Sequence, residues 1–387
     1  MPRFIALPVR QGDAFYLDLG GRSVLVDGGR SERGIRRLFE SATQTNAVRV
    51  AICTHNDADH ANGILGFVRK GLQCDEMWLP GRWLATLPRL LKPFGEVFAE
   101  LASDIGERPE LPIPDFEIYA DQIAVEGFRA SPGGPAVPEN GWPEAYMEML
   151  RQAKSWGRLW RWDWPFQVWG TWPYQRAPWR FPAQGVPLLR SAIDAADRIR
   201  KIALAAFHRG IPVRWFEYDT TNPEGGLPWL QPLNSRQLTE VAVTDLSLLA
   251  LLALTVANQE RLVFWSPPEE SHPGVLFTAD SDLAHVNLPV QLNGAIATAP
   301  HHGAEANAKA YVAVSGASPS AAPSLTWVRS DGRYRGRPGP GYIALQARRI
   351  CTLCRSSNTF TPRHEVQLFA RRGVWTRHTT THVCSCR

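Results

Sequence analysis

The sequence has no long apolar segment. Its longest, Leu246–Ala257, has 12 residues and includes Ser247 and Thr255, whereas a membrane-spanning helix needs about 20 apolar residues. The first residues, Met1 to Phe4, lack the basic and then apolar pattern of a secretory signal. We therefore expect a cytoplasmic protein that has no membrane partner.

Charged residues are also few, at 20% of the chain, while hydrophobic residues make up 44%. This composition allows a sizeable core to be buried and excludes a largely disordered chain. For 387 residues we expect one large domain with an insertion, or two domains.

Positive charge is concentrated in two segments. Residues 151–214 hold twelve Lys or Arg against three Asp or Glu, and residues 329–387 hold twelve against two. Because the whole chain carries only +5, the remainder must be acidic. The two basic segments are either solvated surface or a contact surface for a polyanion or an acidic partner.

Cysteine is scarce, and four of the six cysteines lie near the end of the sequence. Cys351 and Cys354 form a C-x-x-C pair, and Cys384 and Cys386 form a C-x-C pair. In a reducing compartment such cysteines bind metal more often than they form disulfides. The two pairs predict a structural zinc site, and the alternative is that the cysteines are unpaired or disulfide-bonded.

Short apolar strands and helices alternate over residues 1–105 and again over residues 244–346. This order predicts an α/β fold in which two β-sheets pack together with helices outside them. We expect Leu246–Leu254 to be one of the strands. Residues 142–232 contain 10 of the 15 tryptophans, and we interpret 107–235 as an insertion outside the catalytic frame.

The sharpest motif is H-x-D-x-D-H, which directly follows the apolar strand expected at Val48–Cys53. Its four candidate metal ligands are His55, Asp57, Asp59 and His60. At the end of a buried strand these groups would repel one another or stay unsatisfied without a cation. Their alternation suits two metal ions about 3.5–4 Å apart. The alternative is an acidic surface turn with incidental histidines.

This motif resembles the H-x-H-x-D-H signature of the metallo-β-lactamase superfamily, with Asp57 in place of the second histidine. The H-x-D-x-D-H variant is similar to the hydrolase domain of bacterial competence proteins involved in DNA uptake. Five further segments are similar to that domain and follow in the same order: Val9–Ala14, Val24–Gly29, Thr244–Leu248, Leu276–Asp280 and Ala299–Ala304.

The resemblance implies an αββα sandwich and divides the chain into four parts. Residues 1–106 and 236–346 would form the two halves of a metallo-hydrolase domain. Residues 107–235 would be a Trp/Arg-rich insertion between the halves, and residues 347–387 a basic, cysteine-containing tail. The resemblance covers about 1–105 and 240–345, so it does not extend to the insertion or the tail.

The resemblance also implies the role of each candidate ligand. His55 and Asp57 would bind the first metal ion, Asp59 and His60 the second, and Asp280 would bridge the two. One of His301 and His302 would complete the second site, and inspection does not choose between them. We expect Asp57 and Asp59 to be essential for catalysis.

The first site lacks the third protein ligand found in much of the superfamily. In the interval where that histidine is expected, the chain has only His208, in an apolar helical context, and His272, beside a proline. Because Asp57 makes the site harder and more negative, we expect Mn²⁺ to be preferred, with Zn²⁺ as the alternative. Two such ions would activate a bridging water as hydroxide near neutral pH.

Phosphodiester cleavage is the leading functional hypothesis. The resembling domain is associated with DNA degradation, and the insertion combines basic and aromatic residues that suit phosphates and unpaired bases, notably Arg158, Arg161, Trp160 and Trp164. The alternative for these tryptophans is the core of the insertion or an interface with a protein partner. A role as an effector in a multi-protein bacterial defence system is a further expectation.

Two other classes of function stay open. The same fold permits hydrolysis of a small lactam, lactone or thioester. A non-catalytic subunit that uses its arginine-rich surfaces for assembly is the third hypothesis, although the cluster of four ligands argues against it.

Overall fold

The computed structural model describes residues 1–9, 11–106, 116–125, 133–153, 185–257, 261–289, 291–317, 324–330, 336–354 and 364–386. Its helices are α1 (Ile35–Thr43), α2 (Ala58–Arg69), α3 (Gly81–Leu90), α4 (Phe94–Gly106), α5 (Phe116–Val125), α6 (Glu144–Gln152), α8 (Val186–His208), α9 (Leu248–Leu254), α10 (Lys309–Ala317), α11 (Pro340–Ile343) and the 3-10 helices η3 (Pro300–Gly303) and η4 (Glu305–Asn307). The strands are β1 (Arg3–Ala6), β2 (Phe15–Asp18), β3 (Ser23–Val26), β4 (Ala47–Ile52), β5 (Gln73–Pro80), β6 (Val213–Tyr218), β7 (Gln231–Pro232), β8 (Ser235–Gln237), β9 (Phe264–Ser266), β10 (Val275–Phe277), β11 (Ile296–Thr298), β12 (Thr326–Arg329), β13 (Arg348–Cys351), β14 (Val366–Arg371) and β15 (Val374–Arg377).

The strands form two sheets. The larger has the order β15-β14-β1-β2-β3-β4-β5-β6-β8, and the smaller has the order β13-β12-β11-β10-β9-β7. In the larger sheet β3, β4, β5 and β6 are parallel, and in the smaller sheet β10, β11, β12 and β13 are parallel. Parallel neighbours place their carboxyl ends at one edge of each sheet, and the site lies at these two edges.

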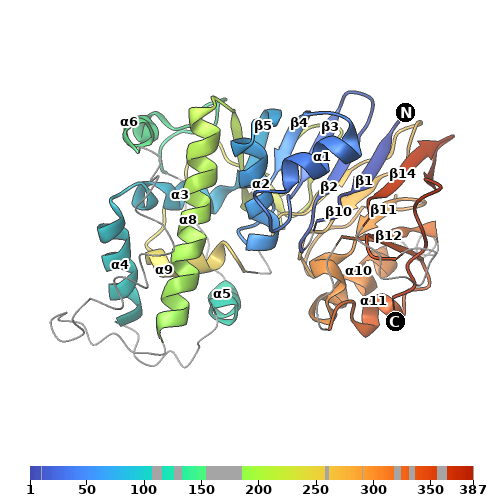
Figure 1. Ribbon diagram of the computed structural model, residues 1–387. Helices are drawn as coiled ribbons and strands as arrows, with labels where there is room; N and C mark the ends of the chain where they lie inside the picture. Colours follow the sequence, from blue (N-terminus) through green and yellow to red (C-terminus); the bar gives the residue numbers. More distant parts are fainter. Residues whose placement is uncertain are drawn as a thin grey trace.

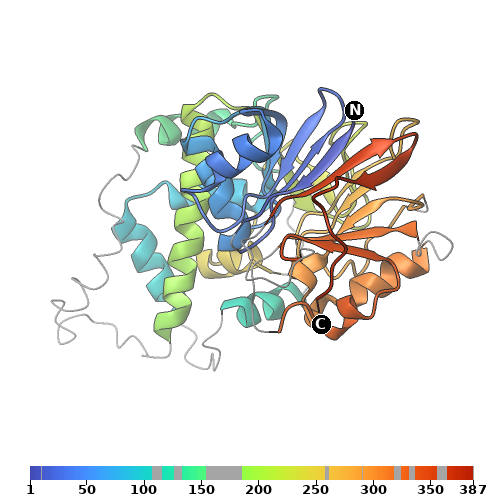
Figure 2. The same ribbon diagram turned by 45° about the vertical axis from the view of Figure 1, so that its right-hand side comes forward.

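Three apolar layers hold the sheets and helices together. One lies between the sheets, where Phe4 stacks on Phe277 and Trp78 packs against Phe264. A second joins the larger sheet to α1, α2, α3 and α8, and a third joins the smaller sheet to α10. Figures 1 and 2 show the helices on the outer faces of the two sheets. The αββα sandwich predicted from the sequence is confirmed.

The apolar run at Leu246–Leu254 forms a helix, α9, and the strand predicted there is wrong. Ser247 begins the helix by accepting a hydrogen bond from the Ala250 amide. All seven residues of α9 are buried, so the run lacks the polar positions that distinguish a helix from a strand by periodicity. Among the described residues, every helix is too short or too polar to cross a lipid bilayer.

Parts of the expected insertion and of the tail belong to the two sheets. β6 pairs in parallel with β5, and α8 packs on α2. From the tail, β14 pairs with β1 in the larger sheet and β13 with β12 in the smaller. The domain boundaries at residues 235 and 346 stay a prediction. At each boundary, strands that pair within one sheet lie both before and after it.

A close backbone contact holds the first turns of α2 against the end of β3. The Gly63 amide donates a hydrogen bond to the Gly29 carbonyl at 2.7 Å. A Cβ atom on Gly63 would lie 1.8 Å from the carbonyl oxygen of Gly28. Only glycine fits this contact, so the position of α2 depends on it.

We expect Gly63→Ala to lower the free energy of unfolding by about 3 kcal/mol or more, because the backbone of Gly28 cannot move aside without shifting β3. Gly95→Ala in α4 is the matched control, because nothing lies within 4 Å of a Cβ atom there. Urea unfolding followed by circular dichroism measures both. Equal stability of the two variants would contradict the close contact.

Candidate metal centre

The candidate ligands come from the ends of strands in both sheets. His55 follows β4, and Asp57 and Asp59 lie at the start of α2 together with His60. Asp280 follows β10, and His302 follows β11. The structure thus brings the local motif together with residues more than 200 positions away in the sequence.

Each of the three central imidazoles is anchored through its Nδ1 atom. The Nδ1 of His60 lies 2.8 Å from Asp27 Oδ2, that of His302 lies 2.9 Å from Asp13 Oδ1, and that of His55 lies 2.9 Å from Thr54 Oγ1. The three Nε2 atoms are buried and have no hydrogen-bond partner within the described part of the chain. Imidazoles oriented in this way are typical of metal ligands.

A first group of ligands consists of His55, Asp57 and Asp280. The Nε2 atom of His55 lies 3.3 Å from Asp57 Oδ2 and 3.8 Å from Asp280 Oδ2. The guanidinium of Arg261 enters the same group, with Nη2 at 2.9 Å from Asp57 Oδ2 and Nη1 at 3.3 Å from Asp280 Oδ2. A permanent positive charge therefore already faces both carboxylates of this group.

A second group consists of Asp13, His60, Asp280 and His302, with Asp59 beside it. His60 Nε2 lies 3.2 Å from Asp280 Oδ1, and His302 Nε2 lies 3.5 Å from Asp59 Oδ2. The neutral amide of Gln11 donates to Asp59 Oδ2 at 3.4 Å. The buried imidazole nitrogens of this group and the carboxylate oxygens that they face fit a divalent cation.

The structure distinguishes the two neighbouring histidines. His302 is fully buried, and its Nε2 atom faces Asp59. His301 is 20% exposed, its Nδ1 atom lies 3.0 Å from Asn307 Oδ1, and its Nε2 atom lies 2.5 Å from Arg337 Nη2. His301 Nε2 also lies 3.7 Å from Asp280 Oδ2. The geometry favours His302 as the ligand and places His301 at the border of the centre.

Negative charge exceeds fixed positive charge in the centre. Burial raises the pKa of Asp57, but His55 and Arg261 outweigh burial and lower the pKa. Burial would lower the pKa of His60, but Asp280 and Asp27 raise it well above the ordinary histidine value. The carboxylates therefore attract positive charge strongly, and imidazoles that would take up protons are also able to take a metal cation.

Backbone strain is concentrated at the same place. Four residues of the centre or next to it have positive φ although they are not glycine: Asp27, Ala279, His301 and His302, with φ between 47° and 59°. Such conformations persist only where the surrounding contacts enforce them, and they are common at functional sites.

Four cysteines form a second cluster, remote in sequence from the His/Asp centre. The Sγ–Sγ distances are 3.8 Å between Cys351 and Cys386, 3.5 Å between Cys354 and Cys386, and 3.8 Å between Cys354 and Cys384. All four are free cysteines. A tetrahedral zinc site with Zn–S bonds of about 2.3 Å has S–S edges of about 3.8 Å, so the four sulfurs fit zinc.

Other candidates lie elsewhere or outside the described residues. His208 ends α8, and His272 packs against Trp375 and hydrogen-bonds the Pro273 carbonyl through Nδ1. Neither is in the His/Asp groups that could hold a metal ion. The substrate-binding residues predicted in the insertion lie outside the described residues: Arg158, Arg161, Trp160 and Trp164.

Three residues that shape the centre have little or no signal in the sequence. Asp13 lies within the segment Val9–Ala14, and its carboxylate lies 2.9 Å from the Nδ1 atom of His302. Thr54 precedes the motif and hydrogen-bonds Asp27 at 2.7 Å. Arg261 lies just before β9 with no recognisable motif around it. The only signals that could indicate them are the Gly-Asp pair at Asp13 and the threonine next to His55.

Comparison with known proteins bears on the first part of the chain. The family model of the metallo-beta-lactamase superfamily matches residues 7–72. This segment contains Asp13, Asp27 and the whole motif from His55 to His60. No curated protein matches the chain. The family match and the two-sheet architecture together support the metallo-beta-lactamase superfamily, whose members are mostly metal-dependent hydrolases.

Proposed function

We propose that this protein is a metal-dependent phosphodiesterase that cleaves nucleic acid. The observation that carries the hydrolase part is the convergence of His55, His60 and His302 on Asp280, with their Nε2 atoms buried and facing carboxylate oxygens. A divalent cation bound there would lower the pKa of a water molecule and stabilise charge on a phosphoryl oxygen.

Aspartates around the centre have separate roles. Asp27 and Asp13 hold His60 and His302 in place through their Nδ1 atoms. Asp59 is 17% exposed, whereas Asp280 and the three histidines are almost fully buried. Asp59 therefore lies where a substrate or a water molecule reaches the centre. Burial raises the pKa of Asp59, but His302 and His60 outweigh burial and lower it well below the ordinary value, so the carboxylate stays ionised and is suited to hold a cation or orient a water molecule.

Two arginines near the centre support a phosphate-containing substrate. Arg337 contacts His301 at the border of the centre. On another side, Arg30 donates to Gln11 at 3.0 Å, and Gln11 in turn donates to Asp59. Arg30 is exposed, so its guanidinium is open to a ligand. Guanidinium groups suit phosphate oxygens better than they suit a neutral lactam or lactone.

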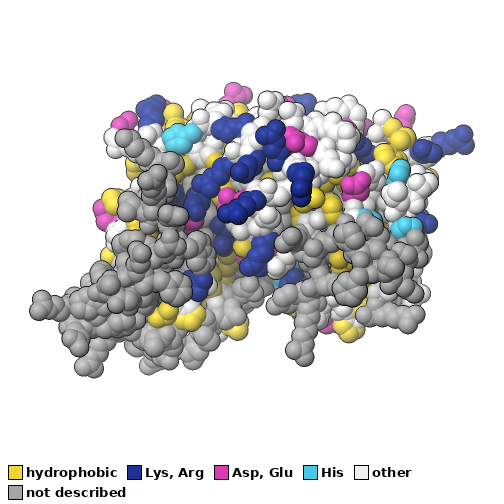
Figure 3. Space-filling view, viewed as in Figure 1, with side chains coloured by type: hydrophobic (Ala, Val, Ile, Leu, Met, Phe, Trp, Pro, Cys, Tyr) yellow, Lys and Arg dark blue, Asp and Glu magenta, His cyan; other side chains and the backbone are white. Residues whose placement is uncertain are grey.

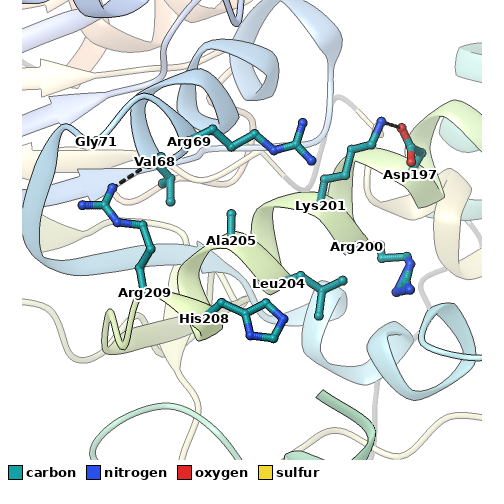
Figure 4. Close-up of a pocket in the computed structure, with 10 residues that line it drawn as sticks. All are labelled: Val68, Arg69, Gly71, Asp197, Arg200, Lys201, Leu204, Ala205, His208 and Arg209. Carbon is teal, nitrogen blue, oxygen red and sulfur yellow. Dashed lines mark hydrogen bonds and ion pairs between the residues drawn. The ribbon is translucent and has the colours of Figure 1, made fainter. Parts of the chain in front are cut away.

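A basic surface lies farther along α2. A pocket of about 410 Å³ lies between α2 and α8 (Figure 4). It is bordered by Arg69, Arg200, Lys201 and Arg209, and by Asp197, which forms an ion pair with Lys201. Lysine and arginine side chains gather on this face of the molecule (Figure 3). Arg69 lies nine residues after His60 on α2, or about 14 Å along the helix. A nucleic acid strand of a few nucleotides spans this distance.

We also propose that the four cysteines bind a structural zinc ion. Arg329 is fully buried and connects this cluster to the His/Asp centre. Its Nη2 atom lies 3.6 Å from Cys386 Sγ, and its Nη1 atom donates to the His302 carbonyl at 3.3 Å. A zinc ion bound by four thiolates would thus fix the segment that presents His302.

The function is tested by digestion of single- and double-stranded DNA and RNA with Mn²⁺ added. We expect cleavage by the wild-type chain and at least about a 10²-fold loss in His302→Gln, because a buried ligand is removed. His301→Gln is the matched control, and we expect it to lose less activity and to retain Mn²⁺ binding. Equal losses in both variants, or no cleavage at any metal concentration, would contradict the proposal.

The basic pocket is tested by the salt dependence of nucleic acid binding in an inactive Asp59→Ala background. We expect Lys201→Glu to weaken binding and to reduce the slope of log Kd against log salt by about 1 for each phosphate that the side chain no longer neutralises. Arg49→Glu is the control, because Arg49 is exposed but outside the pocket. The same slope for wild type and Lys201→Glu would exclude the pocket from the contact surface.

The cysteine site is tested by replacing its metal with Co²⁺, whose tetrahedral thiolate complexes absorb visible light. We expect one such chromophore per chain in wild type and in Cys74→Ser, and none in Cys384→Ser. Loss of the metal should also lower the melting temperature, because metal binding stabilises the folded state. Retention of the chromophore by Cys384→Ser would be incompatible with a four-cysteine site.

A further inference from the structure

Arg261 lies within the ligand group that the sequence assigns to the first metal ion. Its side chain is 1% exposed. Nη2 lies 2.9 Å from Asp57 Oδ2, and Nη1 lies 3.3 Å from Asp280 Oδ2 and donates to the Asp280 carbonyl at 3.1 Å. The guanidinium therefore bridges the two carboxylates that would otherwise share a cation with His55.

The two ligand groups differ in what faces their carboxylates. In the second group, Asp280 Oδ1 faces the imidazole of His60, and Asp59 is contacted by His302 and by the neutral amide of Gln11. In the first group, a guanidinium contacts both Asp57 and Asp280. The first group also contributes one buried imidazole Nε2 atom, whereas the second contributes two.

A fixed guanidinium is a strong competitor for a divalent cation. Arginine stays protonated in proteins, and its planar donors match carboxylate oxygens. The hydrogen bonds from Arg261 occupy lone pairs that a cation would need. A positive charge within hydrogen-bonding distance of both carboxylates also repels a second positive charge placed between them. The first group is thus neutralised in part without metal, and it does not fit an ion as well as the second group does.

We propose that the centre holds a single divalent cation, which is bound by the second group. In the first group, the guanidinium of Arg261 takes the place of a second cation. In this arrangement Arg261 is a positioning residue, because it holds Asp57 and orients Asp280 so that Oδ1 faces His60. The proposal departs from the two ions expected from the sequence. It rests on metal binding at the centre but not on the identity of the substrate.

The experiment is a titration of the metal-depleted chain with Mn²⁺, followed by calorimetry and by electron paramagnetic resonance. Mn²⁺ is chosen because tetrathiolate sites disfavour it, so that the cysteine cluster does not contribute. For wild type we expect one tightly bound Mn²⁺ per chain and the six-line spectrum of an isolated ion. Two tightly bound ions with an exchange-coupled spectrum would overturn the proposal.

Two variants of Arg261 separate charge from folding. In Arg261→Gln we expect affinity for a second Mn²⁺ to rise about tenfold or more, with a coupled spectrum, because the competing charge is gone. Arg261→Lys keeps the charge and should bind one ion. If Arg261→Gln does not fold, the wild-type stoichiometry still decides the question. If Arg261→Gln folds and still binds one ion, the assigned role of Arg261 is wrong.

Cleavage of nucleic acid is tested independently of the number of bound Mn²⁺ ions. A wild-type chain that binds one Mn²⁺ but cleaves no nucleic acid would contradict the proposed phosphodiesterase and leave the role of Arg261 intact. A chain that cleaves nucleic acid with two coupled Mn²⁺ ions would contradict the role of Arg261 and leave the proposed function intact.

Discussion

The excess of buried negative charge at the meeting point of the two sheets is the constraint on which the site depends. Asp13, Asp27 and Asp280 are each about 1% exposed, and Asp57 and Asp59 lie directly beside them. Buried carboxylates are stable only when paired with cations or satisfied by hydrogen bonds. The imidazoles and Arg261 therefore balance the charge of these carboxylates together, and removal of either would leave more negative charge for a cation to neutralise.

The fold holds this cluster together through topology and not through local sequence. Each sheet contributes the carboxyl ends of parallel strands, so neither half of the chain contains a complete centre. The left-handed backbone at Asp27, His301 and His302 brings these residues toward the same point, and their hydrogen bonds offset the strain. The close contact between Gly28 and Gly63 fixes the start of α2, which carries Asp59 and His60.

How much of the structure can be predicted from the sequence depends on how local each feature is. The motif from His55 to His60 lies within six residues, and the two-sheet class follows from the order of apolar segments. The choice between His301 and His302 needs the position of Asp13, which is 289 residues away. Burial of α9 on all sides removes the periodic pattern, so its apolar run predicts a strand where a helix forms. Arg261 has no local signal, because only its packing against the centre gives it a role.

The two clusters of candidate metal ligands differ in chemical hardness. Carboxylates and imidazoles accept Mn²⁺ and Zn²⁺, whereas four thiolates select a soft ion such as Zn²⁺. Arg329 contacts Cys386 and the His302 carbonyl, so the cysteine cluster is mechanically connected to a ligand of the other centre. The tail is therefore part of the framework of the centre: a change in the packing of the four tail cysteines would alter the support of the His302 backbone.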